Sequence, residues 1–295
     1  MIKFENVFTT GWEPALRGMR NPKNSWGKAD TSYYVPEGEL YLVPKIGESD
    51  YDLAMRLVKG GPVHAKFRRM IVVYFDITAP LYWWKEFDTY KIGTVSNSCS
   101  TMHKIDERML GMPDFSTEHL ISFDEDDPQI DFEDQEVKDF YCSLAVKGTD
   151  CVFSPQGVME LVVQMLNRAR YLYKKTGDKR YWWQMIQLLP SSYNQKRTIM
   201  ANYEVLFDAY HSRKGHKLDE WSDTFCEMVE KLPYSEFITT VPARNEPTTD
   251  DILKLFKSEK AIIDAETAKR LAEYAIRKAH EFGIHEFQPY KEETK

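Results

Sequence analysis

The chain has 295 residues, 42% of them hydrophobic and 29% charged, a composition that supports a globular protein with a substantial core. No apolar run approaches the roughly 18 residues that a membrane span requires, and the N-terminus lacks an apolar signal core, so we expect a cytoplasmic protein with no membrane partner. Four cysteines without a CxxC pair favour reduced thiols over a disulfide framework or a zinc site.

The net charge of −7 is concentrated in one segment. Residues 124–139 hold nine acids and one lysine, so the rest of the chain has a balance near +1. A charge run of this kind is typical of a solvated loop, and a dedicated partner site is the alternative. Because the surrounding sequence is irregular and rich in turn residues, we expect residues 105–150 to form an acidic insertion or lid.

Helix and strand signals alternate in the first third of the chain. A helix is predicted over residues 50–59, with Ser49 as a candidate N-cap and a Gly-Gly stop after it. The run MIVVYFDI, residues 70–77, is short, continuous and rich in β-branched and aromatic residues, which predicts a buried strand. The Ala-Pro that follows suits the start of a helix over LYWWKEFDTYK, residues 81–91.

The second half of the chain is mostly helical by its pattern. Apolar residues recur at i, i+3, i+4 and i+7 from residue 155 to Gly177, which predicts a long helix. The same period predicts three further helices, over residues 198–213, 218–232 and 264–283. Helices outnumber strands and no internal repeat is present, so we expect one α+β domain over residues 1–235 and a C-terminal helical extension over residues 236–295.

Basic residues gather in two groups. They are Arg17, Arg20, Lys23 and Lys28 in the first, and Lys66, Arg68 and Arg69 after His64 in the second. Guanidinium and ammonium groups of this kind suit phosphate oxygens. No nucleic-acid-binding motif accompanies them and the chain is acidic, so we expect a small phosphorylated ligand and no nucleic acid.

Metal and nucleotide-loop motifs are missing from the sequence. His211 and His216 are five residues apart, which does not give a shared helical face, and no carboxylate completes a ligand set. We therefore expect no metal site. There is no Walker loop and no GxGxxG motif.

Three positions are candidates for ligand contact. On the predicted helix, Asn202 and Arg213 are eleven residues apart and share a face, so they could clasp two ends of an elongated ligand, with a solvated face as the alternative. His64 follows a glycine turn and could donate a hydrogen bond, although a lone histidine is more often structural.

Cys99, in SNSCST, is the candidate nucleophile. It sits in a small polar loop after the end of a predicted helix, where Lys85, Lys91 or His103 could lower its pKa. The alternative is a small residue in a tight loop.

The order of these features resembles the flavin-dependent thymidylate synthases. The hallmark of that family is Arg-His-Arg, seven residues and then Ser, after a strand that ends in Ala-Pro. Here the strand IVVYFDITAP leads to Thr89-Tyr90-Lys91, the seven residues IGTVSNS and Cys99. The spacing matches, whereas most of the residue types do not.

Other landmarks of the family follow in the same order. Its His after a helix and a glycine turn resembles His64, and its Asn and Arg after a Leu-Pro resemble Asn202 and Arg213. The resemblance covers about residues 10–104 and 154–235, which leaves out the acidic insertion and the C-terminal extension.

The resemblance implies a fold, a reaction and a set of site residues. The fold is that of the thymidylate synthase-complementing proteins, with a central sheet packed with helices, and the reaction is C5 methyl or one-carbon transfer to a dUMP-like pyrimidine nucleotide in a homotetramer, with FAD, a folate and NADPH. Cofactor-binding positions are His64, Thr89, Tyr90, Lys91 and Asn202. Substrate-binding positions are Lys85, Glu86, Asn97, Cys99, Thr101 and Arg213, with Cys99 as the catalytic thiol.

The chain also departs from the family in its chemistry. Of the flavin-holding triplet only Lys91 is a cation, and Glu86 places a carboxylate where the family has an amide. Two hypotheses therefore stay open. The first is a divergent flavin-dependent thymidylate synthase-like enzyme, and the alternative is a non-catalytic oligomeric scaffold or nucleotide-sensing protein that has lost flavin chemistry.

Overall fold

The computed structural model describes residues 2–39, 41–120, 154–242, 269–270 and 273–274. The acidic run at 124–139, most of the predicted insertion at 105–150 and nearly all of the predicted helix at 264–283 lie outside the described residues. The domain boundary at residue 235 stays a prediction.

A four-stranded antiparallel sheet forms the centre of the molecule. Its strands stand in the order β1 (Lys3–Thr10), β4 (Val72–Pro80), β6 (Asn194–Asn202) and β5 (Thr94–Ser98). On β4, Val73, Phe75 and Ile77 are at most 1% exposed, whereas the alternate residues are half-buried or exposed. The buried strand predicted from the run MIVVYFDI is confirmed. A second sheet pairs β2 (Ser32–Tyr34) with β3 (Val43–Lys45).

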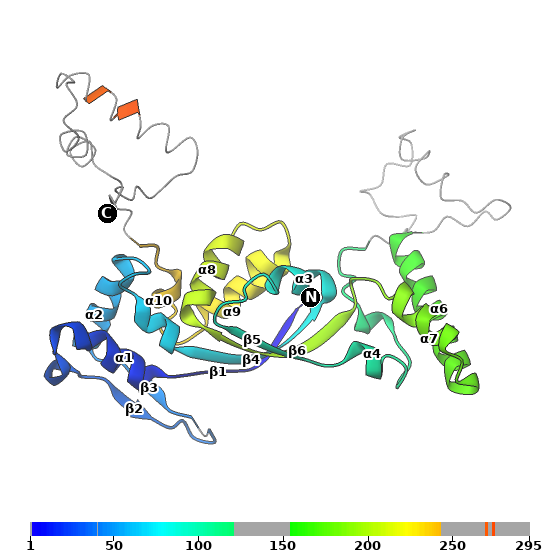
Figure 1. Cartoon of the computed structure of the whole chain (residues 1–295), viewed down its shortest axis with the longest axis horizontal. Coiled ribbons are helices and arrows are strands. Elements are labelled where there is room, and N and C mark those ends of the chain that lie inside the picture. Colours follow the sequence, from blue (N-terminus) through cyan, green and yellow to red (C-terminus); the bar gives the residue numbers. More distant parts are fainter. Residues whose placement is uncertain (1, 40, 121–153, 243–268, 271–272, 275–295) are drawn as a thin grey trace, which may run out of the picture.

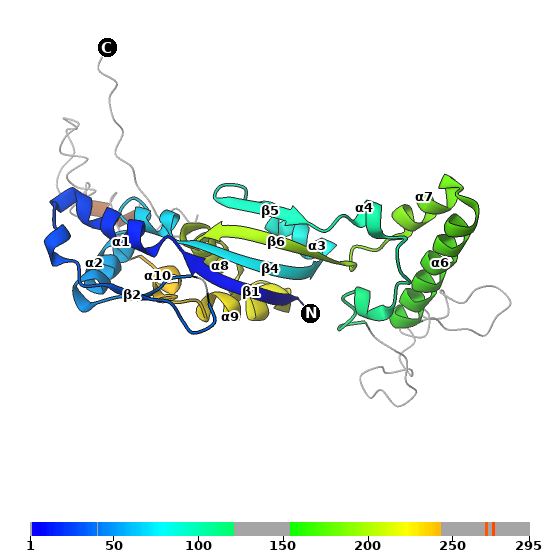
Figure 2. The ribbon, with the colours of Figure 1, turned by 90° about the horizontal axis from the view of Figure 1, so that it is seen from below.

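Helices cover one face of the central sheet (Figure 1). They are α3 (Leu81–Phe87), α8 (Tyr203–Arg213), a π-helical turn at Glu220–Phe225 and α9 (Cys226–Glu230). Figure 2 views the sheet from the other side, where the strands lie open with no described helix in front of them. The molecule is thus an α+β protein in which a central antiparallel sheet is packed with helices.

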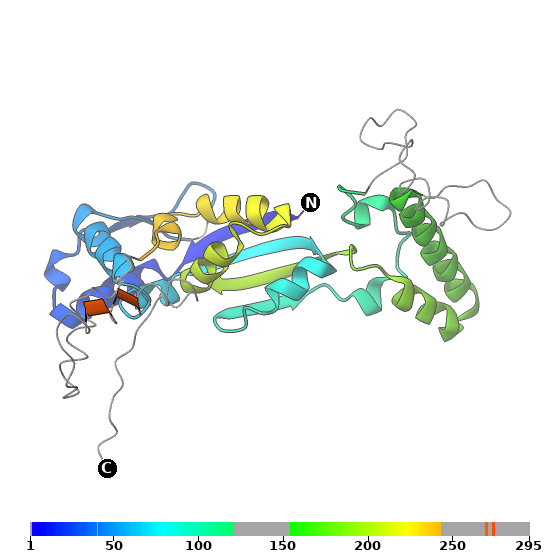
Figure 3. The same cartoon turned by 90° about the horizontal axis from the view of Figure 1, so that it is seen from above.

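The two ends of the sheet continue into different helical groups. One end meets α1 (Trp12–Arg20), α2 (Glu48–Lys59) and α10 (Glu236–Thr239), with short 3₁₀ turns at Asn21–Lys23, Trp26–Lys28 and Lys66–Met70. The other end leads through α4 (Thr101–Lys104) and a 3₁₀ turn at Met112–Asp114 to α6 (Pro155–Thr176) and α7 (Lys179–Leu188). Figure 3 shows α6 and α7 as an arm at one end of the long axis.

Aromatic packing holds the helices to the sheet. Trp83 stacks on Trp221 with ring centres 4.4 Å apart and on Phe87 at 5.2 Å, and all three side chains are at most 3% exposed. Pairs of this kind contribute beyond the area they bury. The arm has a separate small core that includes Leu166 and Met185. The position of α3 is therefore fixed by the same cluster that anchors the turn at 220–225.

The helix predicted over residues 198–213 is wrong in its first part. Residues 194–202 form β6, in which Ile199 pairs with Phe75 and the side chains alternate between two faces. The helix begins only at Tyr203, because the Oδ1 atom of Asn202 accepts a hydrogen bond from the Val205 N–H at 3.0 Å and caps it. Asn202 and Arg213 thus mark the two ends of α8 and do not share one helix face.

The other predicted helices agree more closely with the structure. Those over residues 50–59 and 155–177 are confirmed as α2 and α6, and Ser154 caps α6. The cap predicted for α2 is wrong, because the helix begins at Glu48 and Ser49 lies inside it. The helix over 218–232 corresponds to the π-helical turn and α9. The helix over 81–91 is too long, because α3 ends at Phe87 and residues 88–93 form a turn that leads into β5.

Two buried ion pairs fix the end of the molecule near α1. Arg20 donates from Nε to Asp50 at 2.6 Å, and Arg68 donates from Nε to Glu204 at 2.7 Å. Asp50 also accepts from the Thr31 hydroxyl at 2.7 Å. Burial raises the pKa of Asp50, but the hydrogen bonds from Thr31 and Arg20 outweigh it and hold the pKa below its usual value of 3.8. The ionised Asp50 therefore stabilises the folded state. This stabilisation is complete above pH 3.8, the usual pKa, and is lost as the pH falls through the lowered pKa of the folded state.

Replacing Asp50 by alanine leaves the Arg20 guanidinium buried without its carboxylate. We expect the free energy of unfolding, measured by urea denaturation, to fall by about 3–5 kcal/mol. Glu13→Ala is the matched control, since the Glu13–Arg17 pair is exposed and we expect a loss below about 1 kcal/mol. Equal losses in the two variants would contradict the structural role of Asp50.

Candidate functional site

Three of the predicted site residues meet at the end of α8. Arg213 donates from Nη2 to the Glu86 carboxylate at 2.9 Å and from Nε to the Tyr90 hydroxyl at 3.0 Å. Its guanidinium also lies 4.9 Å from the ring centre of Trp221, within cation–π range. We call Glu86, Tyr90 and Arg213 the arginine cluster. Residues more than 120 positions apart in the sequence are thereby brought together over the aromatic core.

The arginine cluster presents a donor beside an acceptor. Arginine has five N–H donors, of which the two protein contacts use two, and the Arg213 side chain is 15% exposed. The Glu86 side chain is 46% exposed and its oxygens accept hydrogen bonds. Because Glu86 balances the charge of Arg213, the cluster suits a neutral group with adjacent donor and acceptor atoms better than it suits a phosphate.

Asn202 lies beside the start of β5 and not in the arginine cluster. A Cβ placed on Gly93, where φ is +81°, would come within 2.6 Å of the Asn202 Nδ2 atom, so the turn at Gly93 packs directly on this amide. The Asn202 Oδ1 atom is already used by the cap of α8. Position 93 therefore accepts only a glycine, because its φ is positive and because a side chain there would clash with the Asn202 amide.

Cys99 follows the far end of β5. Its N–H donates to the Lys196 carbonyl at 2.9 Å, and its own carbonyl accepts from the Gln195 amide at 3.0 Å. The same Gln195 nitrogen donates to the Thr101 hydroxyl at 3.0 Å. Thr94 to Cys99 spans five extended residues, about 17 Å. A mononucleotide is shorter than that, so Asn202 and Cys99 of one chain do not hold the same mononucleotide.

The Cys99 thiol lines a small cavity of about 280 Å³. Lys104, Arg108 and Lys196 line it too, but each is ion-paired with a carboxylate. In the part of the chain that the structure describes, no hydrogen bond or ion pair joins the thiol to the partners expected from the sequence, Lys85, Lys91 and His103. The cavity therefore places cations near the thiol, each paired with a carboxylate, and no base within hydrogen-bonding distance of the sulfur among the described residues.

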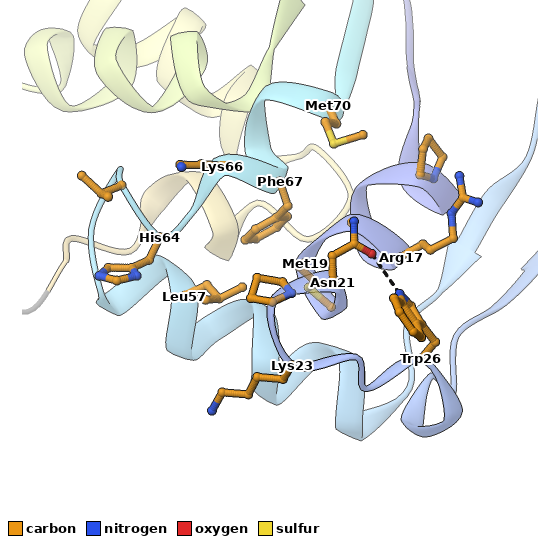
Figure 4. Close-up of a pocket in the computed structure, with 14 residues that line it drawn as sticks. Arg17, Met19, Asn21, Lys23, Trp26, Leu57, His64, Lys66, Phe67 and Met70 are labelled. Carbon is orange, nitrogen blue, oxygen red and sulfur yellow. Dashed lines mark hydrogen bonds between the residues drawn. The ribbon is translucent and has the colours of Figure 1, made fainter.

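His64 lines a much larger cavity, of about 1100 Å³, between α1, α2 and the 3₁₀ turn at Lys66–Met70 (Figure 4). Arg17, Lys23 and Lys66 line it as well, so the two basic groups of the sequence converge here. Arg20 and Arg68, from the same groups, are buried in the ion pairs described above and support the wall. We call this the basic cavity.

The basic cavity is partly apolar and has an aromatic rim. Met19, Leu57 and Phe67 line one side. The Trp26 ring is half exposed, and its Nε1 donates to the Asn21 Oδ1 atom at 2.9 Å, which fixes the ring at the rim (Figure 4). The volume of the basic cavity, about 1100 Å³, is at the upper end of the range for ligand pockets, about 300–1,000 Å³. Cations beside an aromatic rim fit a phosphorylated ligand with a ring system, and a flavin dinucleotide is of that class.

The remaining predicted residues lie near the surface. Lys85, Thr89, Lys91 and Asn97 are exposed, and Asn97 pairs with Thr198 in the sheet. The Thr89 hydroxyl donates to the Glu86 carbonyl at 2.7 Å and so closes the turn after α3. The predicted cofactor residues are therefore divided between the basic cavity, the arginine cluster, this exposed turn and, for Asn202, the start of α8.

Two residues that position the site were missed from the sequence. Arg197 donates from Nη1 to Asp88 at 2.8 Å and from Nε to the Gln195 Oε1 atom at 2.9 Å, and it lies over the Trp84 ring at 4.2 Å. Gln195 in turn holds the backbone at Cys99. Both lie on β6, whose second half was assigned to a helix. The alternation of buried Ile199 and Ala201 was the signal for a strand.

Metal-binding groups and membrane spans are not found in the ranges that the structure describes. No three His, Cys, Asp or Glu side chains gather there in a group that could hold a metal ion. No described helix combines the length and the apolarity needed to cross a bilayer.

Comparisons with known proteins give structural matches alone. No family model matches the chain, and no curated protein matches its sequence. Thymidylate synthase X of Helicobacter pylori, solved with FAD and dUMP, superposes with a TM-score of 0.50 at 16% identity, over 81% of this chain and 97% of that one. At this identity the match shows a shared fold, which is the fold expected from the sequence.

Two further solved structures overlap with the chain. A second structure of the flavin-dependent thymidylate synthase of Helicobacter pylori with FAD and dUMP has a TM-score of 0.48 at 17% identity, over 80% of this chain and 98% of that one. A UMP/dUMP methylase from Streptomyces cacaoi, bound with 5-bromo-dUMP, has a TM-score of 0.46 at 15% identity, over 82% and 97%.

The environments of Cys99 and Cys226 predict different reactivity. Cys99 is exposed, whereas Cys226 is 4% exposed and burial raises its pKa to about 11. At pH 8 only about one Cys226 thiol in a thousand is ionised. We expect iodoacetamide at pH 8 to alkylate Cys99 at least about 100 times faster than Cys226, as measured by peptide mass spectrometry. Urea should abolish the difference between the two rates. Equal rates in the native protein would contradict the exposure of Cys99 and the burial of Cys226.

Proposed function

We propose that this chain is a nucleotide-binding protein with the fold of the flavin-dependent thymidylate synthases. In this proposal the arginine cluster receives the base of a pyrimidine nucleotide such as dUMP, and the basic cavity receives a flavin cofactor. The observation that carries the proposal is the hydrogen bonding of Arg213 to Glu86 and Tyr90, because it joins substrate positions from two distant segments at one point.

The chemistry of the arginine cluster supports binding of a pyrimidine ring. Uracil has an N–H between two carbonyl oxygens, so one ring edge offers a donor and an acceptor side by side. Glu86 can accept from that N–H while Arg213 donates to the adjacent carbonyl oxygen. Tyr90, which is half-buried, lies beside the guanidinium on the outside, and the fully buried Trp221 supports the guanidinium from the core. A free phosphate finds no such match, since Glu86 repels it.

The basic cavity supports binding of FAD. His64, Lys23 and Lys66 would face the phosphates, and Trp26 would lie against a ring system. When bound, a flavin supplies the hydride transfer that protein side chains cannot provide, while the protein supplies binding and orientation. The folate and NADPH expected from the resemblance have no residues assigned to them and stay predictions.

Cys99 is the proposed nucleophile in the enzymatic form of this function. Its thiolate would add to C6 of the pyrimidine ring, so that a C–S bond forms and the electron pair of the C5–C6 double bond moves to C5, which takes a proton from solvent. Loss of the original C5 proton and expulsion of the thiolate from C6 would then restore the double bond. Because the lining of the small cavity includes neither Arg213 nor Glu86, a ring held by those two residues would meet the Cys99 thiol of a second copy of the chain.

A nucleotide sensor without catalysis is the second candidate function. It is favoured by the pairing of Arg213 with Glu86, which already satisfies part of the arginine before any ligand binds. The two candidates share the binding of a nucleotide and differ in chemistry. Exchange of the C5 hydrogen of dUMP with solvent, followed by NMR, separates them, since a sensor leaves that hydrogen in place.

Loss of the arginine should weaken nucleotide binding. We expect Arg213→Met to reduce the affinity for dUMP, measured by isothermal titration calorimetry, by about 10–100-fold, because charged hydrogen bonds contribute about 1.5–3 kcal/mol each. Arg180→Met is the control, since Arg180 is an exposed arginine on α7 that pairs only with Asp178 among the described residues. Unchanged affinity in Arg213→Met, or no dUMP binding by the parent protein, would refute the assignment.

Loss of two lysines should weaken flavin binding. We expect the purified protein to retain or take up FAD, seen as absorption near about 450 nm from the flavin ring. The double variant Lys23→Ala/Lys66→Ala should bind FAD at least about 10-fold more weakly, because phosphate partners are lost. The control is Lys3→Ala/Lys231→Ala, two exposed lysines on β1 and after α9. A colourless protein that does not bind added FAD would contradict the cofactor assignment.

A further inference from the structure

A cavity of about 460 Å³ lies along the outer edge of β1. Thr9, Met228 and Leu232 form its floor and are at most 8% exposed. Phe8 and Tyr41 are half-buried and stand as its walls. Figures 2 and 3 show α9 running beside β1, the outermost strand of the central sheet. We call this space the edge cavity.

Two irregular elements shape the edge cavity. In β1 one extra residue is inserted between Glu5 and Phe8, and Asn6 at this β-bulge has a φ of +53°. Val7, also in the bulge, is 37% exposed and lines the cavity. On the other side Thr224 belongs to the π-helical turn before α9. Bulges and π-helical turns redirect side chains away from regular packing, and both are frequent next to binding sites.

The walls of the edge cavity are held in place by contacts within the protein. Phe8 stacks on both Tyr41 and Tyr74, with ring centres 5.4 Å and 5.2 Å apart. On the floor, the Thr9 hydroxyl accepts a hydrogen bond from the Trp12 Nε1 atom at 2.9 Å. The cavity is therefore preformed, as ligand sites usually are, because closing it would break these contacts.

The size and the charge of the edge cavity predict a class of ligand. An apolar protein cavity of about 150 Å³ holds benzene, so one of about 460 Å³ suits a molecule of roughly two or three rings. Most of the lining is apolar, and its two charged residues, Glu227 and Lys231, pair with each other at 2.8 Å. An ionised ligand would lose its hydration here without gaining a partner, which favours an uncharged one.

Three hydroxyl groups supply polar contacts in the edge cavity. Those of Tyr41 and Thr224 form no hydrogen bond with any residue that the structure describes. The Thr9 oxygen accepts from Trp12, but its O–H donates to no described group. Each hydroxyl therefore has a proton to donate, and a carbonyl oxygen is a matching acceptor.

We propose that the edge cavity binds an uncharged molecule of two or three fused rings that carries a carbonyl oxygen. The rings would lie among Phe8, Tyr41, Met228 and Leu232, since aromatic rings and thioether groups pack well against ring systems. The carbonyl would accept from one of the three hydroxyls. The edge cavity shares no residue with the basic cavity or the arginine cluster, so its ligand is independent of the proposed function.

Methyl NMR of the full chain, labelled with ¹³C in the methionine methyl groups, tests the proposal. Coumarin serves as the probe, because it is uncharged and has two fused rings and one carbonyl. We expect a saturable shift of the Met228 methyl resonance, assigned with Met228→Leu, because the ring current of a bound aromatic molecule acts on a methyl group in contact with it. The Met185 methyl, in the core of the arm, should not shift.

A blocking variant and a charged probe complete the test. Val7→Trp should fill the mouth of the cavity and weaken coumarin binding by at least about tenfold, whereas Val158→Trp, at an exposed valine on α6, should leave it unchanged. Circular dichroism melts check that both variants fold. The naphthoate ion, also of two fused rings, should bind at least about tenfold more weakly than coumarin. No shift of Met228, binding that survives Val7→Trp, or equal affinity for naphthoate would overturn the proposal.

Discussion

The pairing of β4 with β6 is the constraint on which the rest of the structure depends. The two strands run antiparallel from Val72 opposite Asn202 to Pro80 opposite Asn194. Backbone hydrogen bonds extend the pair at both ends, from the Leu81 N–H to the Tyr193 carbonyl and from the Tyr203 N–H to the Ile71 carbonyl. Because α3 follows β4 and α8 follows β6, the two helices leave from opposite ends of one strand pair.

This geometry explains why the arginine cluster forms. Both helices lie on the same face of the sheet and run back over it, so the end of α8 meets α3 and the turn after it. The aromatic cluster of Trp83, Phe87 and Trp221 joins α3 to the turn at 220–225 that follows α8. The distance between Arg213 and its two partners is thus set by the sheet and the aromatic core together. Close packing of aromatic rings of this kind leaves the guanidinium of Arg213 little room to move.

Charge compensation distinguishes the site from a simple anion pocket. Where the resemblance leads one to expect an amide, Glu86 supplies a carboxylate that pairs with Arg213. Cations of the kind that suits phosphate gather elsewhere, in the basic cavity, whose supporting arginines are neutralised by Asp50 and Glu204 while its lysines face the open space. In the proposed function, the base of the nucleotide and the phosphates of the flavin therefore bind at different places in the fold.

Much of this fold, but less of the site, could be predicted from the sequence. Strand β4 and helices α2 and α6 follow from the hydrophobic pattern, because each has a continuous local signal, although the cap predicted for α2 was wrong. Strand β6 was hidden, since Ile199, Met200 and Tyr203 fit a helical period as well as an alternating one, and only the pairing with β4 decides between them. The partners of Arg213 lie more than 120 residues away, and no local pattern encodes such a contact.

The central claim, that the arginine cluster receives a pyrimidine base, is tested most directly by locating a heavy atom on that base. Crystals grown with 5-bromo-dUMP would give an anomalous signal from the bromine. We expect one strong peak beside the arginine cluster, with the ring edge within hydrogen-bonding distance of the Arg213 guanidinium and the Glu86 carboxylate. A bromine peak in the basic cavity, or none in crystals of a protein saturated with the nucleotide, would contradict the claim.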